Sequence, residues 1–84
     1  MSIEDAIRTR IKELAEERGT TVSALCLDSL ITPSTISDFM TRKSKCPKVV
    51  TIKKLCFGAN ITLREFFDRD YFDTVEDILE IKNE

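Results

Sequence analysis

The sequence contains no histidine, only two glycines and only three cysteines among its 84 residues. Histidine is the commonest general base and a frequent zinc ligand, and a phosphate-binding loop is rich in glycine. Cys26, Cys46 and Cys56 are odd in number and too widely spaced to form the close pairs of a zinc site. We expect Cys26 and Cys56 to be buried as small apolar residues and Cys46 to lie in a loop. The residues that remain form no catalytic group, so the sequence predicts a protein that is not an enzyme and has no metal or cofactor.

Long apolar runs are also missing. None approaches the roughly 20 residues that a membrane-spanning helix needs, and the first ten residues, MSIEDAIRTR, lack the profile of a signal peptide. No repeat, low-complexity segment or flexible linker divides the chain. Because domains run from about 50 to 250 residues, we expect residues 1–84 to form a single domain in the cytoplasm, without membrane contact.

The net charge of −2 is distributed unevenly along the chain. Residues 1–30 carry −2, residues 31–60 carry +5, and residues 61–84 carry −5. Asp38 is the only acidic residue in the basic middle third. The middle third therefore has the charge expected of a surface that meets a polyanion such as DNA, although the whole chain does not.

The central residues 21–40 predict two short helices joined by a tight turn. The second helix is expected over residues 33–40, with Thr32 as its N-cap and a proline at its first position. Ile36 and Phe39 fall on the side that faces the core. The opposite side carries short polar side chains, which the DNA major groove can accept: Ser34, Thr35, Ser37 and Asp38.

Two helices are predicted before residues 33–40. The first runs over residues 3–17, capped by Ser2 and stopped at Gly19. The second, which is the first of the two central helices, runs over residues 21–29 and is capped by Thr21. One apolar stripe at helical spacing defines the first helix: Ile3, Ile7, Ile11 and Leu14. We interpret its acidic residues as a solvated outer face, because nothing supplies the apolar pocket of a catalytic carboxylate pair: Glu13, Glu16 and Glu17.

Two more helices are predicted after the basic loop of residues 41–48. The fourth spans roughly residues 50–57 and is ended by Gly58 and Asn60. The fifth opens with a capping box formed by Thr62 and Glu65. Its expected core residues are Leu63, Phe66 and Phe67.

This ordered series of segments resembles the Xre/Cro family of phage-repressor-like helix-turn-helix domains, without gaps from about Ile7 to Phe67. The segments that carry the resemblance are residues 10–14 and 17–19 for the first helix, 25–26 and 34–37 for the helix-turn-helix, 43–47 for the basic loop, and 51–55 and 61–67 for the last two helices. The resemblance implies an all-α, five-helix phage-repressor-like DNA-binding domain with a core of about residues 3–68.

Two positions depart from the family pattern. Val22 stands where the family often has a glutamine that touches DNA, so it could contact a thymine methyl group or the sugar edge, or only pack. Leu30 stands in the turn where the family often has a glycine. Because a left-handed leucine would be strained, we expect this turn to have an adjusted geometry.

The resemblance implies sequence-specific binding of double-stranded DNA by a small transcriptional regulator, a repressor that acts as a homodimer on a pseudo-palindromic operator. The residues expected to face bases are Val22, Pro33, Ser34, Ser37 and Asp38. The residues expected to face phosphates are Thr21, Thr35, Arg42, Lys43 and Lys45. For Asp38 the alternative is an ion pair with Arg42 one turn away.

The last residues, about 69–84, form an acidic extension outside the resemblance. The capping pattern of residues 73–76 predicts a short helix, which must cover either the first helix of its own domain or a second copy of the chain. The apolar residues that motivate a homodimer are Tyr71, Phe72, Val75, Ile78 and Leu79. The alternative function is a protein-interaction module, such as the antitoxin of a toxin–antitoxin pair, which would bind its partner through this acidic segment.

Overall fold

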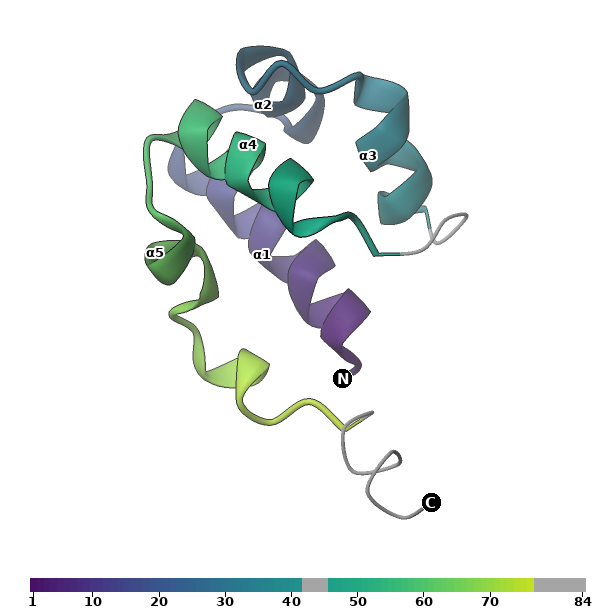
Figure 1. The fold of residues 1–84 in the computed structure, drawn as a ribbon, viewed down its shortest axis with the longest axis vertical. Helices are drawn as coiled ribbons and strands as arrows, with labels where there is room; N and C mark the ends of the chain where they lie inside the picture. Colours follow the sequence, from purple (N-terminus) through teal and green to yellow (C-terminus); the bar gives the residue numbers. More distant parts are fainter. Residues whose placement is uncertain (42–45, 77–84) are drawn as a thin grey trace.

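The computed structural model describes residues 1–41 and 46–76, and these residues form helices and no strands (Figure 1). The helices are α1 (Ile3–Glu17), α2 (Val22–Asp28), α3 (Pro33–Met40), α4 (Val49–Ala59) and α5 (Leu63–Phe67), followed by a short 3-10 helix, η1 (Asp70–Phe72). α2 packs against α1, α3 and α4, whereas α5 packs against α4 and η1 packs against α1. In Figure 1, α3 and α5 lie on opposite sides of the molecule. The prediction of an all-α, five-helix fold is confirmed.

Most helices begin where a side chain can cap them. The backbone N–H of Asp5 donates to Ser2 Oγ at 3.1 Å. The capping box of α5 is complete, because Glu65 N–H donates to the hydroxyl of Thr62 at 3.0 Å and Thr62 N–H donates to the Glu65 carboxylate at 2.9 Å. The prediction for Thr32 is only half right: it occupies the N-cap position of α3 in an extended conformation, but its side chain makes no capping hydrogen bond.

The core is one cluster of apolar side chains to which all five helices contribute. Its most deeply buried members include Ile11, Leu14, Leu25, Ile36, Phe39, Leu55 and Phe66. The prediction that Phe67 joins the core is wrong. Its side chain is 38 % exposed and packs edge-on against Phe66 and Phe72.

Gly58 lies inside α4, which runs to Ala59, so the prediction that this glycine ends the helix is wrong. Its role is to let α4 approach the end of α2, because a Cβ atom at this position would lie 3.0 Å from Ser29 Cα and would overlap Ser29 Oγ. Ser29 is itself buried and donates its hydroxyl to Leu25 O at 2.7 Å. Asn60 ends α4 in a left-handed conformation with a φ of 59°, as predicted.

The turn between α2 and α3 keeps a left-handed residue, so the prediction of an adjusted geometry at Leu30 is wrong. Leu30 has a φ of 58°. Around it, Ile31 N donates to Cys26 O at 3.0 Å and Leu30 N donates to Leu27 O at 3.3 Å, which is the Schellman pattern of a helix end. The leucine therefore adopts the strained conformation that glycine adopts without cost.

We expect Leu30→Gly to raise the free energy of unfolding by up to about 1 kcal/mol, because the roughly 1–2 kcal/mol cost of a left-handed L-residue is partly offset by the greater conformational freedom of glycine in the unfolded chain. The Leu30 side chain is 81 % exposed, so little packing is lost with it. Leu30→Ala is the matched control, since it removes most of the same side chain but keeps the Cβ atom. Urea denaturation measures both variants, and equal stability of Leu30→Gly and Leu30→Ala would contradict the prediction.

The extension continues the packing beyond α5 along α1. The hydroxyl of Tyr71 donates to Glu13 Oε1 at 2.6 Å, and Arg69 Nη2 donates to Glu17 Oε1 at 3.3 Å. Val75 is 7 % exposed. Of the two alternatives for the extension, the structure therefore supports its own domain as the surface that residues 69–76 cover.

Several predictions about this region need correction. Tyr71, Phe72 and Val75 were expected to offer an apolar surface to a second copy, but they are half-buried or buried within their own domain. The predicted solvated face of α1 is confirmed for Glu16 and Glu17, which are exposed, whereas Glu13 is half-buried. Glu13 and Glu17 also bond to residues of the extension, which the sequence did not predict. The capping pattern of residues 73–76 opens no helix within those residues, and Ile78 and Leu79 lie outside the described part of the chain.

The titration of Tyr71 tests this packing. Burial raises the pKa of Tyr71, and the hydrogen bond to Glu13 raises this pKa further because a phenolate would face a carboxylate. The chain has one tyrosine and no tryptophan, so tyrosinate absorbance reports this side chain alone. We expect tyrosinate to form in the folded protein only well above pH ~10, the value of an unfolded chain.

The sign of the linked stability follows from the raised pKa. The contribution of Tyr71 is fully present below the unfolded pKa and is lost as the pH rises through the folded pKa. The same titration in concentrated urea is the control. Superimposable titration curves in the folded and unfolded states would show that Tyr71 does not pack against Glu13.

Candidate nucleic-acid interface

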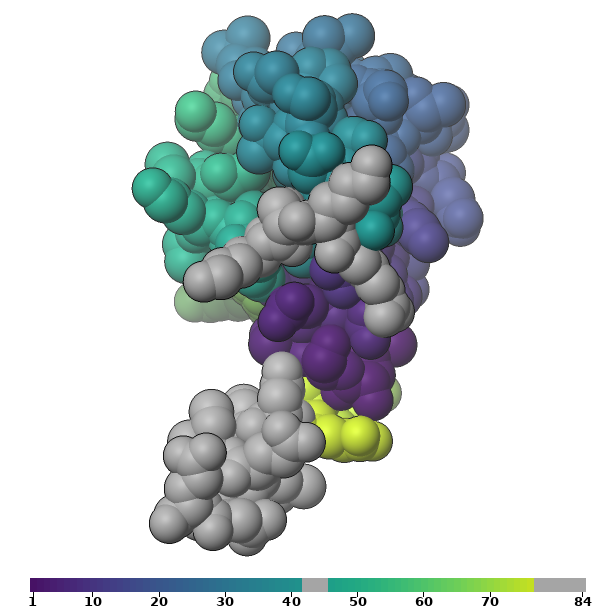
Figure 2. All heavy atoms as spheres, turned by 90° about the vertical axis from the view of Figure 1, so that its right-hand side faces the viewer, coloured from purple at the N-terminus to yellow at the C-terminus, as the bar shows by residue number. Residues whose placement is uncertain are grey.

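α3 has one buried side and one exposed side. Ile36 and Phe39 are fully buried in the core. Figure 2 looks at the exposed side, where α3 (teal) lies between α2 (blue) and the start of α1 (purple). The residues exposed on α3 are Ser34, Thr35, Ser37 and Asp38. The predicted division of this helix into a core side and a polar outer side is confirmed.

A hollow of about 280 Å³ lies between α2 and α3, beside Lys12 of α1. It is lined by Lys12, Val22, Ser23, Cys26, Pro33, Ser37 and Met40. Three of the residues predicted to face bases therefore meet at one place: Val22, Pro33 and Ser37. Ser34 and Asp38 are exposed on α3 but do not line this hollow. Val22 is half-buried and also packs against the edge of the core.

The two threonines predicted to face phosphates differ in their surroundings. Thr21 is the N-cap of α2, where its hydroxyl oxygen accepts from Ala24 N at 3.1 Å. This bond uses the oxygen as an acceptor, so the hydroxyl hydrogen can still be donated to an anion. Thr35 is exposed on the first turn of α3. Both hydroxyls are reachable from outside the protein.

The basic loop that follows α3 is only partly described. Arg42, Lys43 and Lys45 lie outside the described residues, so their contact with phosphate stays a prediction, as does the alternative pairing of Asp38 with Arg42. Past the gap, exposed lysines continue the basic segment onto α4: Lys48, Lys53 and Lys54.

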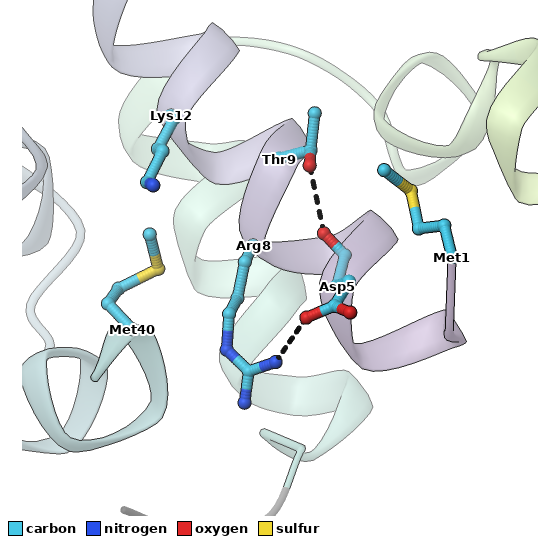
Figure 3. A pocket seen from close by; sticks show the side chains of 6 residues that line it. All are labelled: Met1, Asp5, Arg8, Thr9, Lys12 and Met40. Atoms are coloured by element: carbon cyan, nitrogen blue, oxygen red, sulfur yellow. Dashed lines mark hydrogen bonds and ion pairs between the residues drawn. The ribbon is translucent and has the colours of Figure 1, made fainter. Parts of the chain in front are cut away.

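Arg8, on α1, anchors the last turn of α3. Its Nε donates to Phe39 O at 2.7 Å, and its guanidinium lies 4.4 Å from the centre of the Phe39 ring. Its Nη1 pairs with Asp5 Oδ1 at 2.9 Å, as Figure 3 shows. The side chain is buried. Because Phe39 is in the last turn of α3, the cation also meets the negative end of the helix dipole.

A second hollow, of about 340 Å³, opens beside this anchor, and its lining residues are shown in Figure 3. They are Met1, Asp5, Arg8, Thr9, Lys12 and Met40. The guanidinium in its wall is already bonded to Phe39 and Asp5, so Arg8 positions α3 and does not serve as a free cation for a ligand.

Arg10 anchors α5 on the other side of the fold, as Arg8 anchors α3. Its Nε donates to Phe66 O at 2.7 Å and its Nη2 to Glu65 O at 3.1 Å, while Nη1 pairs with Glu17 Oε1 at 3.0 Å. The side chain is 2 % exposed. α1 is therefore bonded to the last turn of α3 through one arginine and to the last turn of α5 through another.

Sequence reasoning missed the anchoring role of both arginines. The only signal was their position, since Arg8 follows Ile7 and Arg10 precedes Ile11, which places each one at the border of the apolar stripe of α1. An arginine at such a border can extend its guanidinium over the core to a neighbouring helix.

The cysteines lie where the sequence predicted. Cys26 and Cys56 are buried and Cys46 is exposed. Burial raises the pKa of the Cys26 and Cys56 thiols, which keeps them protonated and unreactive. Among residues 1–41 and 46–76, no group of three or more potential metal ligands comes together. No helix in this part of the chain is long and apolar enough to cross a membrane.

We expect Arg8→Lys to lower the free energy of unfolding by roughly 1–3 kcal/mol, the cost of losing a buried hydrogen bond to a charged donor. Lysine keeps the charge but has neither the Nε–H group nor the planar surface that covers Phe39. The control is Arg18→Lys, because Arg18 is exposed at the end of α1. If urea denaturation gave equal losses for the two variants, Arg8 would not anchor α3.

Comparison with known proteins agrees with this geometry. The family model of the Cro/C1-type HTH DNA-binding domain matches residues 10–70, which include α2, α3 and the hollow between them. No curated protein and no solved structure matched the chain. The match covers most of the sequence and confirms the resemblance that the motifs indicated. The chain belongs to the family of Cro/C1-type helix-turn-helix DNA-binding domains.

Proposed function

We propose that this protein binds double-stranded DNA sequence-specifically and regulates transcription as a repressor of a pseudo-palindromic operator. The observation that carries the proposal is the presentation of α3. One side of this helix is fixed to the core by Ile36, Phe39 and the Arg8 anchor, and the other side is exposed and made of short side chains. A fixed helix with a slender polar side can enter a major groove.

Base recognition falls to residues at and near the leading end of α3. Ser34, Ser37 and Asp38 can hydrogen-bond to base edges, and Pro33 and Val22 can make apolar contacts. Asp38 is the most specific of these, because a carboxylate is repelled by phosphates but can accept a hydrogen bond from the amino group of cytosine.

Phosphate contacts are proposed for the hydroxyls of Thr21 and Thr35 and for the basic loop, through Arg42, Lys43 and Lys45. Such contacts fix the position of the protein on DNA without reading sequence. If each of two subunits places about three cations on phosphates, log K should fall with a slope of roughly −5 against log salt. The acidic extension reduces this slope to the extent that it competes for the same cations.

We also propose that the protein acts as a homodimer in the cytoplasm. One eight-residue recognition helix reads few base pairs, and two copies on a palindrome double the number that is read. This argument concerns recognition alone, since Tyr71, Phe72 and Val75 pack within their own domain. Light scattering that gives about 9.6 kDa for the free protein, together with one subunit per operator in the complex, would contradict it.

A second candidate function is an interaction module, such as an antitoxin, which would bind a protein partner. The observation that favours it is a set of apolar side chains exposed at 65–81 % on α2, its following turn and α4: Leu27, Leu30 and Phe57. These residues replace the acidic extension as the candidate partner surface, because residues 69–76 are held by α1.

Selection of bound duplexes from a random pool tests the proposed function directly. We expect an enriched palindrome, and no enrichment even at low salt would favour the interaction module instead.

Asp38→Ala in the same selection distinguishes base reading from anchoring. We expect it to relax the preference at one base pair per half-site, a loss of ~1–3 kcal/mol of discrimination, while non-specific affinity stays equal or rises because a negative charge has gone. Lys43→Ala is the contrasting variant, which should weaken all sequences alike and flatten the salt slope by about one per subunit. An unchanged motif with Asp38→Ala would assign Asp38 to the Arg42 pair, worth only ~0.2–0.5 kcal/mol.

A further inference from the structure

The hollow between α2 and α3 combines apolar walls with one lysine. Its walls are largely hydrocarbon or sulfur, from Val22, Cys26, Pro33 and Met40, and they include the first residue of each of the two helices. At its border stands Lys12 of α1, an exposed lysine. An apolar recess with one cation beside it suits a ligand that has an apolar group next to an anion.

Within DNA, one nucleotide fits this description. Among the four bases only thymine carries a methyl group on its major-groove edge, and each nucleotide brings its phosphate close to that edge. We propose that this hollow takes one thymidine nucleotide of each operator half-site, with its 5-methyl group against Val22 and Pro33 and its phosphate at Lys12. The inference rests on the proposed function, since it concerns the same face of the protein.

Val22 and Lys12 have separate roles in this proposal. Val22 is the first residue of α2 and is half-buried, so its position is fixed by the N-cap of that helix. It therefore determines specificity, in place of a side chain that would hydrogen-bond to a base. Lys12 lines both this hollow and the one beside the Arg8 anchor. It supplies charge without reading sequence, and Ser37 also lines the hollow.

Replacement of thymidine by deoxyuridine removes one methyl group and changes nothing else in the duplex. In the duplex selected from the random pool, each thymine is replaced in turn and the affinity is measured by fluorescence anisotropy. We expect one thymine per half-site at which deoxyuridine weakens binding about fourfold, the value of one buried methyl group. At that same position, 5-methylcytosine should bind better than cytosine by a similar factor.

Val22→Thr tests whether the hollow is responsible. Threonine has the shape of valine but replaces one of its two methyl groups by a hydroxyl, so the fourfold preference for thymine over uracil should become smaller. Val49→Thr is the matched control, because Val49 is the first residue of α4, is 66 % exposed and does not line the hollow. This control should keep the preference. Urea denaturation of both variants checks that their folds are equally stable.

Lys12→Gln tests the phosphate contact. It should weaken binding to the thymine and deoxyuridine duplexes by the same factor and lower the salt slope by about one per subunit. Arg64→Gln is the control, since Arg64 is exposed on α5, on the side of the molecule opposite α3 (Figure 1).

The outcomes separate this inference from the proposed function. Equal affinity for every deoxyuridine duplex, or a full thymine preference in Val22→Thr, would overturn the thymidine site while DNA binding stands. An unchanged salt slope in Lys12→Gln would overturn the role of Lys12. A protein that selects no DNA would overturn both proposals.

Discussion

Two buried guanidiniums on one helix determine how the rest of this fold is arranged. Arg8 and Arg10 project from α1 in different directions, and each donates its Nε–H to the backbone carbonyl of a phenylalanine near whose ring it lies. Both carbonyls belong to the last turn of a short helix, where backbone acceptors lack partners within the helix. The two cations thus satisfy these acceptors and orient α3 and α5 relative to the same helix. A buried charge left without its partners would be costly, so the arrangement is cooperative.

The anchoring matters for α3, because an eight-residue helix is not stable alone in water. Its orientation comes from contacts on its inner side, so the residues on its outer side can be changed without loss of those contacts. The exposed side chains there are short, so the helix backbone itself must come close to the bases for Ser34, Ser37 or Asp38 to reach them. Pro33 has no backbone N–H and offers only hydrocarbon at the leading end, which suits the apolar hollow beside it.

The sequence predicted features that are encoded locally. Apolar spacing located α1 and α3, and the capping box of Thr62 and Glu65 located α5, because each signal lies within a few residues of the structure it forms. The outer residues of α3 were predicted for the same reason. By contrast, the close approach at Gly58 and the anchoring by Arg8 depend on partners about 30 residues away. No local pattern indicates whether an arginine meets water or a carbonyl.

The turn at Leu30 and the extension show the same limit of prediction from the sequence. The turn at Leu30 was judged by the strain of a single residue, but the hydrogen bonds of Ile31 and the packing of both helices hold it in place. The aromatic residues of the extension were judged by their hydrophobicity, which does not distinguish a partner in the same chain from one in another. Tyr71 meets Glu13 across 58 residues of sequence, a pairing visible only after folding.

Because the extension packs on α1, the folded unit and the proposed DNA-binding surface end at different residues of the chain. The residues that could meet DNA end well before Asp68, whereas the packing continues to Val75 and to the hydrogen bond between Glu76 N and Met1 O. A chain truncated after α5 would keep every proposed DNA contact, yet Glu13 and Glu17 would lose Tyr71 and Arg69, and Phe66 would lose the ring of Phe72 beside it. The folded unit is thus longer than the proposed DNA-binding surface, and proteolytic release of the extension would remove contacts from α1 and α5 without removing a single residue from α3.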